Sequence, residues 1–188
     1  MTTPGSRPSG PQSPPQFVRA VPEGDDRPRL MCTRCGFVRY ENPKVVVGTV
    51  AAWNDGRILL CRRAIEPRPG LWTLPAGYLE LHETAVEGAQ REAWEEARAR
   101  IDIDQLLAVY SIPRLSQIQL IYRARLLSPD VSPGSETSET GLFEWDRIPW
   151  SQIAFPSVVW ALNHYRERLG QSGFAPFANP PGETGEIP

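Results

Sequence analysis

Three glutamates in one stretch of the sequence have the type and spacing to bind a divalent cation. Glu92, Glu95 and Glu96 lie in the run R-E-A-W-E-E. On a helix, residues three and four positions apart share one side, so the three carboxylates would lie close together and repel one another. A hard cation such as Mg²⁺ would relieve this repulsion by taking oxygen ligands. By itself such a run is more typical of a solvated acidic face, so the neighbouring residues decide the interpretation.

The residues before these glutamates complete a longer pattern. Gly77 begins a loop, Glu83 closes it, and Arg91 directly precedes Glu92. The full pattern, G-x5-E-x7-R-E-x-x-E-E, resembles the Nudix box, the signature of hydrolases that cleave nucleoside diphosphates linked to another moiety. Many fixed positions at the required spacing rarely arise by chance. One box position departs from the family, because Arg98 stands where the family has glycine.

The resemblance implies a role for each matched residue. Arg91 and Glu83 would hold the loop and the helix together, with Gly77 in the same loop, and Arg91 would act with the glutamates in catalysis. The cation would be Mg²⁺ or Mn²⁺. The implied metal ligands and catalytic carboxylates are Glu92, Glu95 and Glu96.

A further carboxylate is expected from a later part of the chain. Residues 128–141, S-P-D-V-S-P-G-S-E-T-S-E-T-G, predict a long polar loop. In the family, a glutamate from such a loop often completes the metal site or removes the proton from the attacking water. We expect Glu139 to take this role ahead of Glu136, although a solvated loop carboxylate remains the alternative for both.

The helix that carries the three glutamates is predicted to begin at about residue 85. Thr84 and Glu87 have the S/T-x-x-E spacing of a capping box. A glycine at its far end would adopt a left-handed conformation at no cost, so at Arg98 either the helix runs on or the arginine adopts that conformation with strain. Small side chains at spacings of three and four predict a face that lies close on a sheet. This face consists of Val86, Ala89, Ala93 and Ala97.

Four long strands and one further helix are predicted around this helix, with short strands within residues 64–76 and 142–155. The first two strands are joined by the hairpin signal Asn54-Asp55-Gly56, and Pro156 begins the last helix. The fold class is therefore α/β, and the resemblance implies an α/β/α sandwich with a mixed central sheet. The predicted strands span 45–54, 57–63, 101–110 and 117–127, and the helix spans 157–168.

A short N-terminal segment, residues 17–44, carries the motif Cys32-Thr33-Arg34-Cys35-Gly36. The spacing is that of a zinc knuckle, but a structural zinc site normally has two such pairs. No Cys or His occurs at 17–20, about where the preceding pair would fall. We therefore interpret the segment as a knuckle remnant and do not expect Zn²⁺ within one chain. A zinc ion shared between two chains is left open.

Composition places one domain between two tails. Proline, serine and glycine dominate residues 1–16, and glycine and proline are frequent over 170–188, so both ends are predicted to be disordered. The Nudix domain is then expected over residues 45–169. The net charge of −2 gives no electrostatic reason to expect nucleic-acid binding.

The expected location is the cytoplasm. No run of eighteen apolar residues occurs, so no membrane span is expected, and the N-terminus lacks a hydrophobic signal core. Three cysteines do not form a disulfide framework, which favours a reducing compartment.

The resemblance extends beyond the box, from about Leu30 to Leu169. The segments C-T-R-C-G-F-V-R-Y-E-N-P-K, G-L-W-T-L-P-A-G-Y-L-E and L-F-E-W-D-R-I-P-W are similar to plant plastid FAD/ADP-ribose pyrophosphatases and their bacterial homologues. This implies Mg²⁺-dependent hydrolysis of ADP-ribose, FAD or a similar dinucleotide, with release of a nucleoside monophosphate. The alternatives are a house-cleaning nucleoside triphosphate pyrophosphatase and a non-catalytic ADP-ribose sensor. A small nucleotide is the expected partner, and a homodimer is left open.

Overall fold

The computed structural model describes residues 14–186 of the 188, so most of the predicted N-terminal tail lies outside the described residues. The chain divides between Asn42 and Pro43 into two units, which are described separately. No helix among the described residues is long and apolar enough to cross a membrane.

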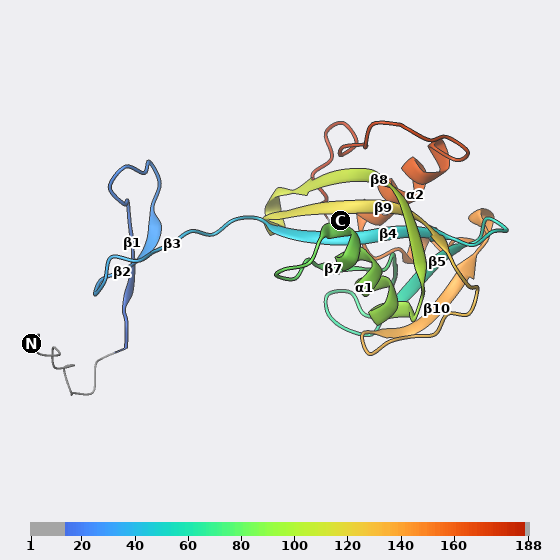
Figure 1. Ribbon diagram of the computed structural model, residues 1–188, viewed down its shortest axis with the longest axis horizontal. Helices are drawn as coiled ribbons and strands as arrows, with labels where there is room; N and C mark the ends of the chain where they lie inside the picture. Colours follow the sequence, from blue (N-terminus) through green and yellow to red (C-terminus); the bar gives the residue numbers. More distant parts are fainter. Residues whose placement is uncertain (1–13, 187–188) are drawn as a thin grey trace, which may run out of the picture. The chain divides into compact units, whose positions relative to one another are not determined.

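The N-terminal unit is a small antiparallel sheet. Its strands are β1 (Phe17–Ala20), β2 (Arg29–Cys32) and β3 (Val38–Arg39) (Figure 1). Cys32 ends β2, and the turn that follows places Gly36 at a φ of 72°, with the Gly36 N–H donating to the Cys32 carbonyl oxygen over 3.0 Å. Only Pro22 and Cys32 are buried among the described residues of this unit. The strands therefore form with almost no apolar core of their own.

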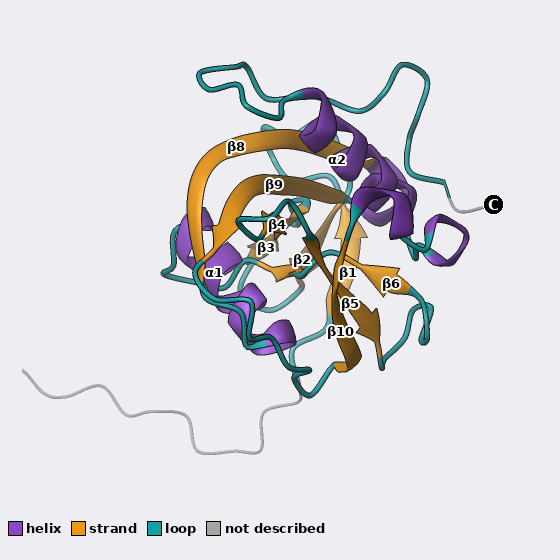
Figure 2. Cartoon of the chain, turned by 90° about the vertical axis from the view of Figure 1, so that its right-hand side faces the viewer, coloured by secondary structure: helices purple, strands orange, loops and turns teal. Residues whose placement is uncertain are grey.

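The larger unit is built on a mixed seven-stranded sheet (Figures 1 and 2). Its main path has the order β10-β5-β4-β9-β8, in which β4 and β9 are parallel and the other neighbours antiparallel; β6 pairs with β5 and β7 with β4. The predicted fold class is confirmed. The strands are β4 (Lys44–Ala52), β5 (Ile58–Arg63), β6 (Trp72–Thr73), β7 (Ala76–Tyr78), β8 (Ile101–Ile112), β9 (Gln117–Leu126) and β10 (Thr137–Phe143).

Two helices cover opposite faces of this sheet (Figure 2). The α1 helix (Ala85–Ala97) packs with β4, β5 and β9 through small side chains, and the α2 helix (Pro156–Glu167) packs through Val158, Trp160 and Leu162 on the other face. Short 3-10 turns at Pro113–Leu115, Trp145–Arg147 and Trp150–Gln152 complete the unit. The small side chains on α1 bring its backbone close to the strands, which positions its glutamates at the edge of the sheet.

The start of α1 is confirmed in detail, and its expected apolar face in part. Thr84 accepts the Glu87 N–H over 3.2 Å while the Glu87 carboxylate accepts the Thr84 N–H over 2.7 Å, so the capping box is complete. The side chains of Ala89, Ala93 and Ala97 are fully buried. Val86 is 39% exposed, so its place in the buried face was predicted wrongly; in the first turn it is Ala85 that packs against the core.

The end of α1 is a left-handed residue without glycine. Arg98 adopts φ 50° and ψ 24°, and its N–H donates to the Ala93 and Trp94 carbonyl oxygens. The box position that departs from the family therefore keeps the backbone conformation that glycine would supply. The arginine guanidinium lies over the Trp94 ring, with 5.6 Å between the guanidinium carbon and the ring centroid.

We expect Arg98→Gly to raise the free energy of unfolding by roughly 0.5 to 1 kcal/mol, because it removes the cost of left-handed backbone in an L residue. Urea denaturation would measure the change. Arg100→Gly is the matched control, since Arg100 does not have a positive φ and glycine there should bring no gain. A less stable Arg98→Gly protein would show that the stacking on Trp94 outweighs the backbone strain.

The C-terminal segment differs from the disordered tail predicted over residues 170–188. Its described part, up to residue 186, runs along β8, the edge strand of the sheet. Phe177 exchanges backbone hydrogen bonds with Leu107 and Val109, and its ring stacks on His164 at 4.0 Å between centroids. The Asn179 side chain bonds both to the N–H and to the carbonyl oxygen of Ser111. The unpaired backbone groups of the edge strand β8 and the apolar rings of Phe174 and Phe177 account for this order. The prediction of disorder missed it because it used only the glycine and proline content of the whole segment.

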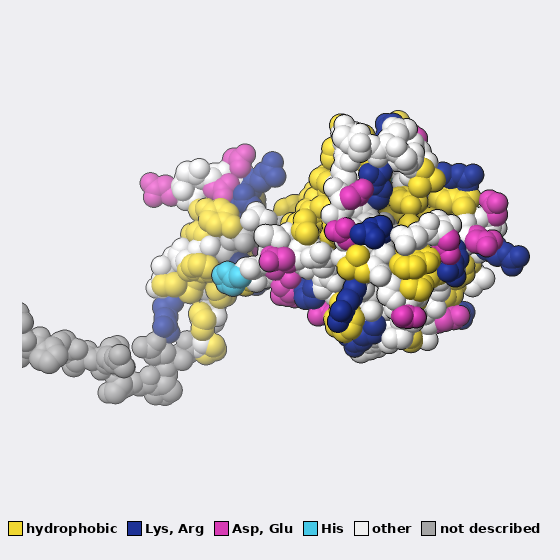
Figure 3. All heavy atoms as spheres, turned by 45° about the vertical axis from the view of Figure 1, so that its right-hand side comes forward, with side chains coloured by type: hydrophobic (Ala, Val, Ile, Leu, Met, Phe, Trp, Pro, Cys, Tyr) yellow, Lys and Arg dark blue, Asp and Glu magenta, His cyan; other side chains and the backbone are white. Residues whose placement is uncertain are grey.

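Charged side chains are mixed on the surface of the larger unit. On the face drawn in Figure 3, acidic and basic side chains lie among one another and do not gather into a patch of one sign. That face therefore presents no continuous basic surface of the kind that tracks a nucleic-acid backbone.

Candidate active site

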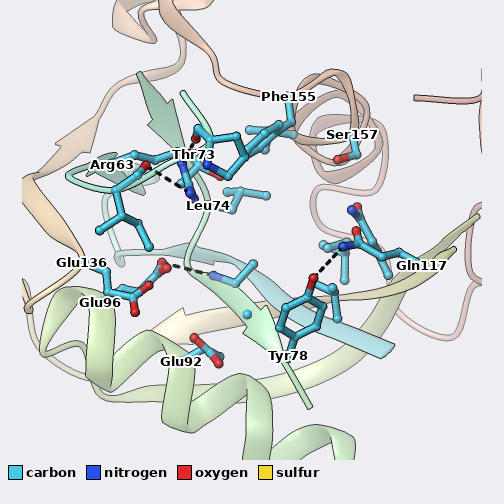
Figure 4. A pocket seen from close by; sticks show the side chains of 18 of the residues that line it. Arg63, Thr73, Leu74, Tyr78, Glu92, Glu96, Gln117, Glu136, Phe155 and Ser157 are labelled. Carbon is cyan, nitrogen blue, oxygen red and sulfur yellow. Dashed lines mark hydrogen bonds between the residues drawn. The ribbon is translucent and has the colours of Figure 1, made fainter. Parts of the chain in front are cut away.

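A cavity of about 720 Å³ lies beside α1 in the larger unit. Its walls come from α1, β7, the start of β9, the loop before β10 and the start of α2 (Figure 4). Carboxylates line one side, and hydroxyl, amide and aromatic side chains line the others. The cavity therefore joins the predicted glutamate cluster to a polar and apolar surface large enough for a nucleotide.

Glu96 is the most strongly perturbed carboxylate in the cavity. It is 8% exposed, and its carboxylate accepts a hydrogen bond from the Ala76 N–H over 3.2 Å. Burial raises the pKa of Glu96 to about 8, and repulsion from Glu92 and Glu136 adds to the shift that the Ala76 hydrogen bond partly offsets. A buried carboxylate without a cationic partner is costly, and a bound cation would remove that cost.

Glu92 lies one turn before Glu96 and is also 8% exposed. Burial raises the pKa of Glu92, although the neighbouring Arg91 guanidinium acts in the opposite direction. Gly77 on β7 lies directly against this side chain, and a Cβ at Gly77 would overlap the Glu92 carboxylate. The glycine of the box therefore leaves the space beside β7 that the Glu92 carboxylate occupies.

Arg91 ties the box loop to the helix, as the resemblance implied. Its guanidinium donates to both carboxylate oxygens of Glu83, over 2.7 and 3.0 Å, and to the Tyr78 carbonyl oxygen over 3.0 Å. It also donates to Glu92 over 2.7 Å and to Glu95 over 3.1 Å. The hydrogen bonds from Arg91 lower the pKa of Glu83 to about 2. One cation thus holds three carboxylates and the β7 backbone in place.

The predicted loop glutamate is not the one that the structure brings to the cavity. The loop ends at Glu136 and β10 begins at Thr137, so Glu139 lies within the strand, opposite Arg62. Its carboxylate pairs with the Arg62 guanidinium over 3.2 Å and its side chain is 55% exposed, away from the cavity lining. Glu136 lines the cavity instead and lies beside Glu96 (Figure 4). The preference for Glu139 over Glu136 is therefore corrected, because the loop predicted to run through residue 141 contains the start of β10 at Thr137.

The loop that carries Glu136 is fixed to the end of α1. The Ser132 N–H donates to the Ala97 carbonyl oxygen over 2.9 Å, and the Gly134 N–H donates to that of Glu96 over 3.0 Å. A Cβ at Gly134 would collide with the Glu95 carbonyl oxygen. These contacts satisfy carbonyl groups that a helix end leaves free, and they set Glu136 beside the box glutamates.

The donor set suits a hard divalent cation. Glu92, Glu96 and Glu136 offer carboxylate oxygens within one cavity, and two of them have raised pKa values that a cation would reverse. Among residues 14–186 no three potential ligands are already gathered at coordinating distance. Arg91 accounts for part of this, because it draws the carboxylates of Glu92 and Glu95 toward its own guanidinium.

Several lining residues were not predicted from the sequence. Tyr78 on β7 and Gln119 on β9 both pair with Val46 of β4, which places them in one row across the sheet. The Gln117 amide donates to the Tyr78 hydroxyl over 3.1 Å. Gln117 and Gln119 alternate with Ile118 and Leu120, which could have signalled one polar face at the start of the strand. Thr73 and Ser157 line the opposite wall and had no such signal.

Comparison with known proteins assigns both units. Residues 42–164 match the NUDIX domain family, and residues 15–41 match the family described as the Nudix N-terminal zinc ribbon. The thiols of this ribbon do not complete a zinc site in one chain, since only Cys32 and Cys35 lie in it and the third cysteine, Cys61, is buried in β5. No role for zinc in the chemistry follows from this ligand set.

Curated relatives carry names of phosphoanhydride hydrolases. A MutT-like protein of Streptomyces ambofaciens is 37% identical over 54% of this chain and 62% of its own length. An ADP-ribose pyrophosphatase of Methanocaldococcus jannaschii is 30% identical over 62% of this chain and 69% of its own length. The NAD-capped RNA hydrolase NudC of Chromobacterium violaceum is 29% identical over 73% of this chain, which spans about half of that relative, 52%.

A solved structure extends the similarity over nearly the whole molecule. A NUDIX hydrolase from Nitrosomonas europaea has 45% sequence identity and a TM-score of 0.82, covering 89% of this chain and 96% of that one. The NUDIX domain of Shewanella oneidensis NrtR in complex with ADP ribose shares the fold, with a TM-score of 0.58 at 20% identity over 69% of this chain and 90% of that one. With the box geometry in place and the domain match spanning most of its length, the chain belongs to the Nudix hydrolase family.

Proposed function

We propose that the protein hydrolyses the pyrophosphate bond of a nucleoside diphosphate derivative, namely ADP-ribose, FAD or a related dinucleotide, and releases a nucleoside monophosphate. Mg²⁺ is the proposed cofactor, with Mn²⁺ as a substitute. The observation that carries this proposal is the buried pair Glu92 and Glu96, which faces a cavity of about 720 Å³ without enough positive charge to neutralise it.

The box residues have distinct parts in this proposal. Glu92, Glu95 and Glu96 hold the cation, and Arg91 with Glu83 keeps their helix against the Gly77 loop. When bound, such a cation neutralises phosphate charge and lowers the pKa of a coordinated water. Glu95 is the least constrained ligand, since its side chain is 55% exposed and only Arg91 bonds to it.

Glu136 is the proposed base. It replaces Glu139, whose carboxylate is paired with Arg62 outside the cavity. Glu136 reaches the same space as Glu96, so it can take a proton from a water placed between the carboxylates and the substrate phosphorus. As an alternative role it adds an oxygen ligand to the cation.

We expect Glu136→Gln to lower kcat by about 10²-fold, because a positioned general base contributes on the order of 10² to 10⁴. Glu139→Gln, three residues away with the same change of charge, should stay within about twofold of the unaltered protein. Turnover under saturating Mg²⁺ measures both. The reverse order of effects would return the role of base to Glu139.

Substrate preference is proposed from the resemblance to FAD/ADP-ribose pyrophosphatases and from the names of the relatives. The plant plastid subgroup remains part of this proposal, as do a location in the cytoplasm and the absence of a nucleic-acid partner. A homodimer is left open. The rival function is that of a house-cleaning nucleoside triphosphate pyrophosphatase.

A substrate panel with Mg²⁺ tests the proposal. ADP-ribose, FAD and NADH would be incubated with the protein and scored by phosphate release after coupling to a phosphatase, which does not attack their internal anhydride. The nucleoside triphosphates would be scored by pyrophosphate release, measured as phosphate after coupling to an inorganic pyrophosphatase. Release from dinucleotides supports the proposal, and release from triphosphates alone supports the rival. Tight binding of ADP-ribose without any release would identify a non-catalytic sensor.

A further inference from the structure

Two hydroxyl side chains lie in the cavity wall that faces the carboxylates. Ser157 is 8% exposed and Thr73 is 6% exposed, and both line the cavity (Figure 4). Among residues 14–186 no side-chain hydrogen bond is formed by either hydroxyl, and neither oxygen is fully enclosed by protein, so both are open to the cavity. Buried hydroxyl groups without partners are costly, so groups that face a cavity in this state are typically satisfied by what the cavity binds.

Ser157 is also the second residue of α2, a helix of 12 residues. Its N-cap, Phe155, offers no side-chain hydrogen bond, and the first helical residue, Pro156, has no N–H. The Val158 N–H donates to the Phe155 carbonyl oxygen over 3.1 Å, whereas the Ser157 N–H has no acceptor within the described chain. The wall therefore presents a free backbone donor at the positive end of a helix dipole.

Charges around this helix start favour an anion. The first turn of α2 contains no acidic residue. Arg63 lines the same part of the cavity, with its guanidinium carbon 5.3 Å from the centroid of the Phe155 ring. Glu92, Glu96 and Glu136 line the side of the cavity away from Ser157 (Figure 4).

We propose that the start of α2 is a phosphoryl subsite, in which the Ser157 N–H and Oγ donate to a phosphoryl oxygen of a nucleotide and the Thr73 hydroxyl supplies a third donor. The subsite rests on the proposed function, because it lies in the same cavity and its ligand is a phosphoryl group of the substrate or of the monophosphate product. It would hold that group independently of the cation, since its donors belong to the other wall.

Binding of AMP and of adenosine in the presence of EDTA tests this subsite. Titration calorimetry would compare the unaltered protein with Ser157→Ala, Ser157→Asp and Thr73→Val. Loss of a hydrogen bond to a charged group costs about tenfold to a hundredfold in affinity, so Ser157→Ala should weaken AMP binding by about tenfold. Ser157→Asp should weaken it by about a hundredfold or more, because a carboxylate repels the phosphoryl group. The affinity of each variant for adenosine should stay within about twofold of that of the unaltered protein.

The variants are chosen so that a loss of AMP binding can be distinguished from a loss of folding. An aspartate in the first turn of a helix favours its dipole, so Ser157→Asp should keep α2 while it repels an anion. Ser151→Asp is the matched control, because it adds the same charge at an exposed position outside the cavity lining. Thr73→Val removes only a hydroxyl at nearly constant volume, so it tests the subsite even where Ser157→Asp fails to fold.

Three outcomes would overturn the subsite. AMP affinity that is unchanged in Ser157→Asp or Thr73→Val excludes it, and so does an unaltered protein that does not bind AMP without metal. Equal losses for AMP and adenosine would show that this wall binds the nucleoside and not the phosphoryl group. Since no turnover is measured, an inactive substrate panel beside Ser157-dependent AMP binding would overturn the proposed function and leave the subsite intact.

Discussion

Replacing Glu96 with Gln is expected to abolish Mg²⁺-dependent turnover and, at the same time, to stabilise the metal-free protein at pH 8 and above. Glu96 is 8% exposed, its carboxylate forms no salt bridge within residues 14–186, and Arg63 acts on its charge only from a distance. Loss of this ligand should reduce kcat/KM by roughly 10³-fold or more, because the site then lacks one of its carboxylates for the cation. The amide oxygen of glutamine can still accept the Ala76 N–H, so the local structure should survive.

The gain in stability follows from the direction of the pKa shift. The folded pKa of Glu96 is about 8, above the ordinary value of 4.5 that the unfolded chain retains. Between these values the folded state binds more protons than the unfolded state, so stability falls as the pH rises from about 4.5 to 8. Glutamine does not titrate and removes this loss. We expect the variant to be more stable by about 1 to 3 kcal/mol above pH 8, which corresponds to a few degrees in Tm.

Thermal unfolding at pH 6 and pH 8.5, with EDTA or with Mg²⁺, would measure both effects. The unaltered protein should gain stability from Mg²⁺ at the higher pH, and Glu96→Gln should gain much less. Glu139→Gln serves as control, since that carboxylate is exposed and outside the cavity. Full turnover by Glu96→Gln would exclude Glu96 as a ligand. If the unaltered protein and Glu96→Gln were equally stable at pH 8.5 without metal, the ionised Glu96 carboxylate would not destabilise the fold.

Features that depend on a few neighbouring residues were predictable from the sequence. The capping box of Thr84 and Glu87 needs only the first turn of a helix, and the contacts of Arg91 follow from residues within one loop and one helix. The effect of arginine in place of glycine at position 98 is also local, because the end of α1 holds Arg98 in the left-handed conformation that glycine would adopt. The geometry of the box could therefore be predicted without knowledge of how the strands pair.

Features that depend on strand pairing were not predictable in the same way. Glu136 and Glu139 have similar surroundings in the sequence, and only the register of β10 against β5 turns one into the cavity and the other toward Arg62. Ser157 enters the cavity because α2 crosses the far face of the sheet, a distant packing that its own segment does not encode. The order of residues 170–186 likewise comes from the free edge of β8.

Replacing Arg91 with Lys is expected to weaken both the fold and the activity, although the charge is kept. The guanidinium fork makes five hydrogen bonds to four partners, and a single ammonium group cannot reach them all. Glu83 would lose its bidentate partner, and the carboxylates of Glu92 and Glu95 would be free to move apart. We expect a loss of about 1 to 2 kcal/mol in the free energy of unfolding and of about 10²-fold in kcat/KM.

The pH dependence of stability separates this role from a general loss of packing. Arg91 holds the pKa of Glu83 at about 2, below the ordinary 4.5, so this pairing stabilises the fold above about pH 4.5 and the contribution disappears as the pH falls toward 2. In Arg91→Lys the acid-induced part of the loss should shrink, which urea denaturation between pH 3 and pH 7 would show. Arg125→Lys is the matched control, because its pair with Asp102 is exposed on both sides and should contribute little. An acid profile that is unchanged in Arg91→Lys would mean that Glu83 is held by the Glu80 N–H and not by Arg91.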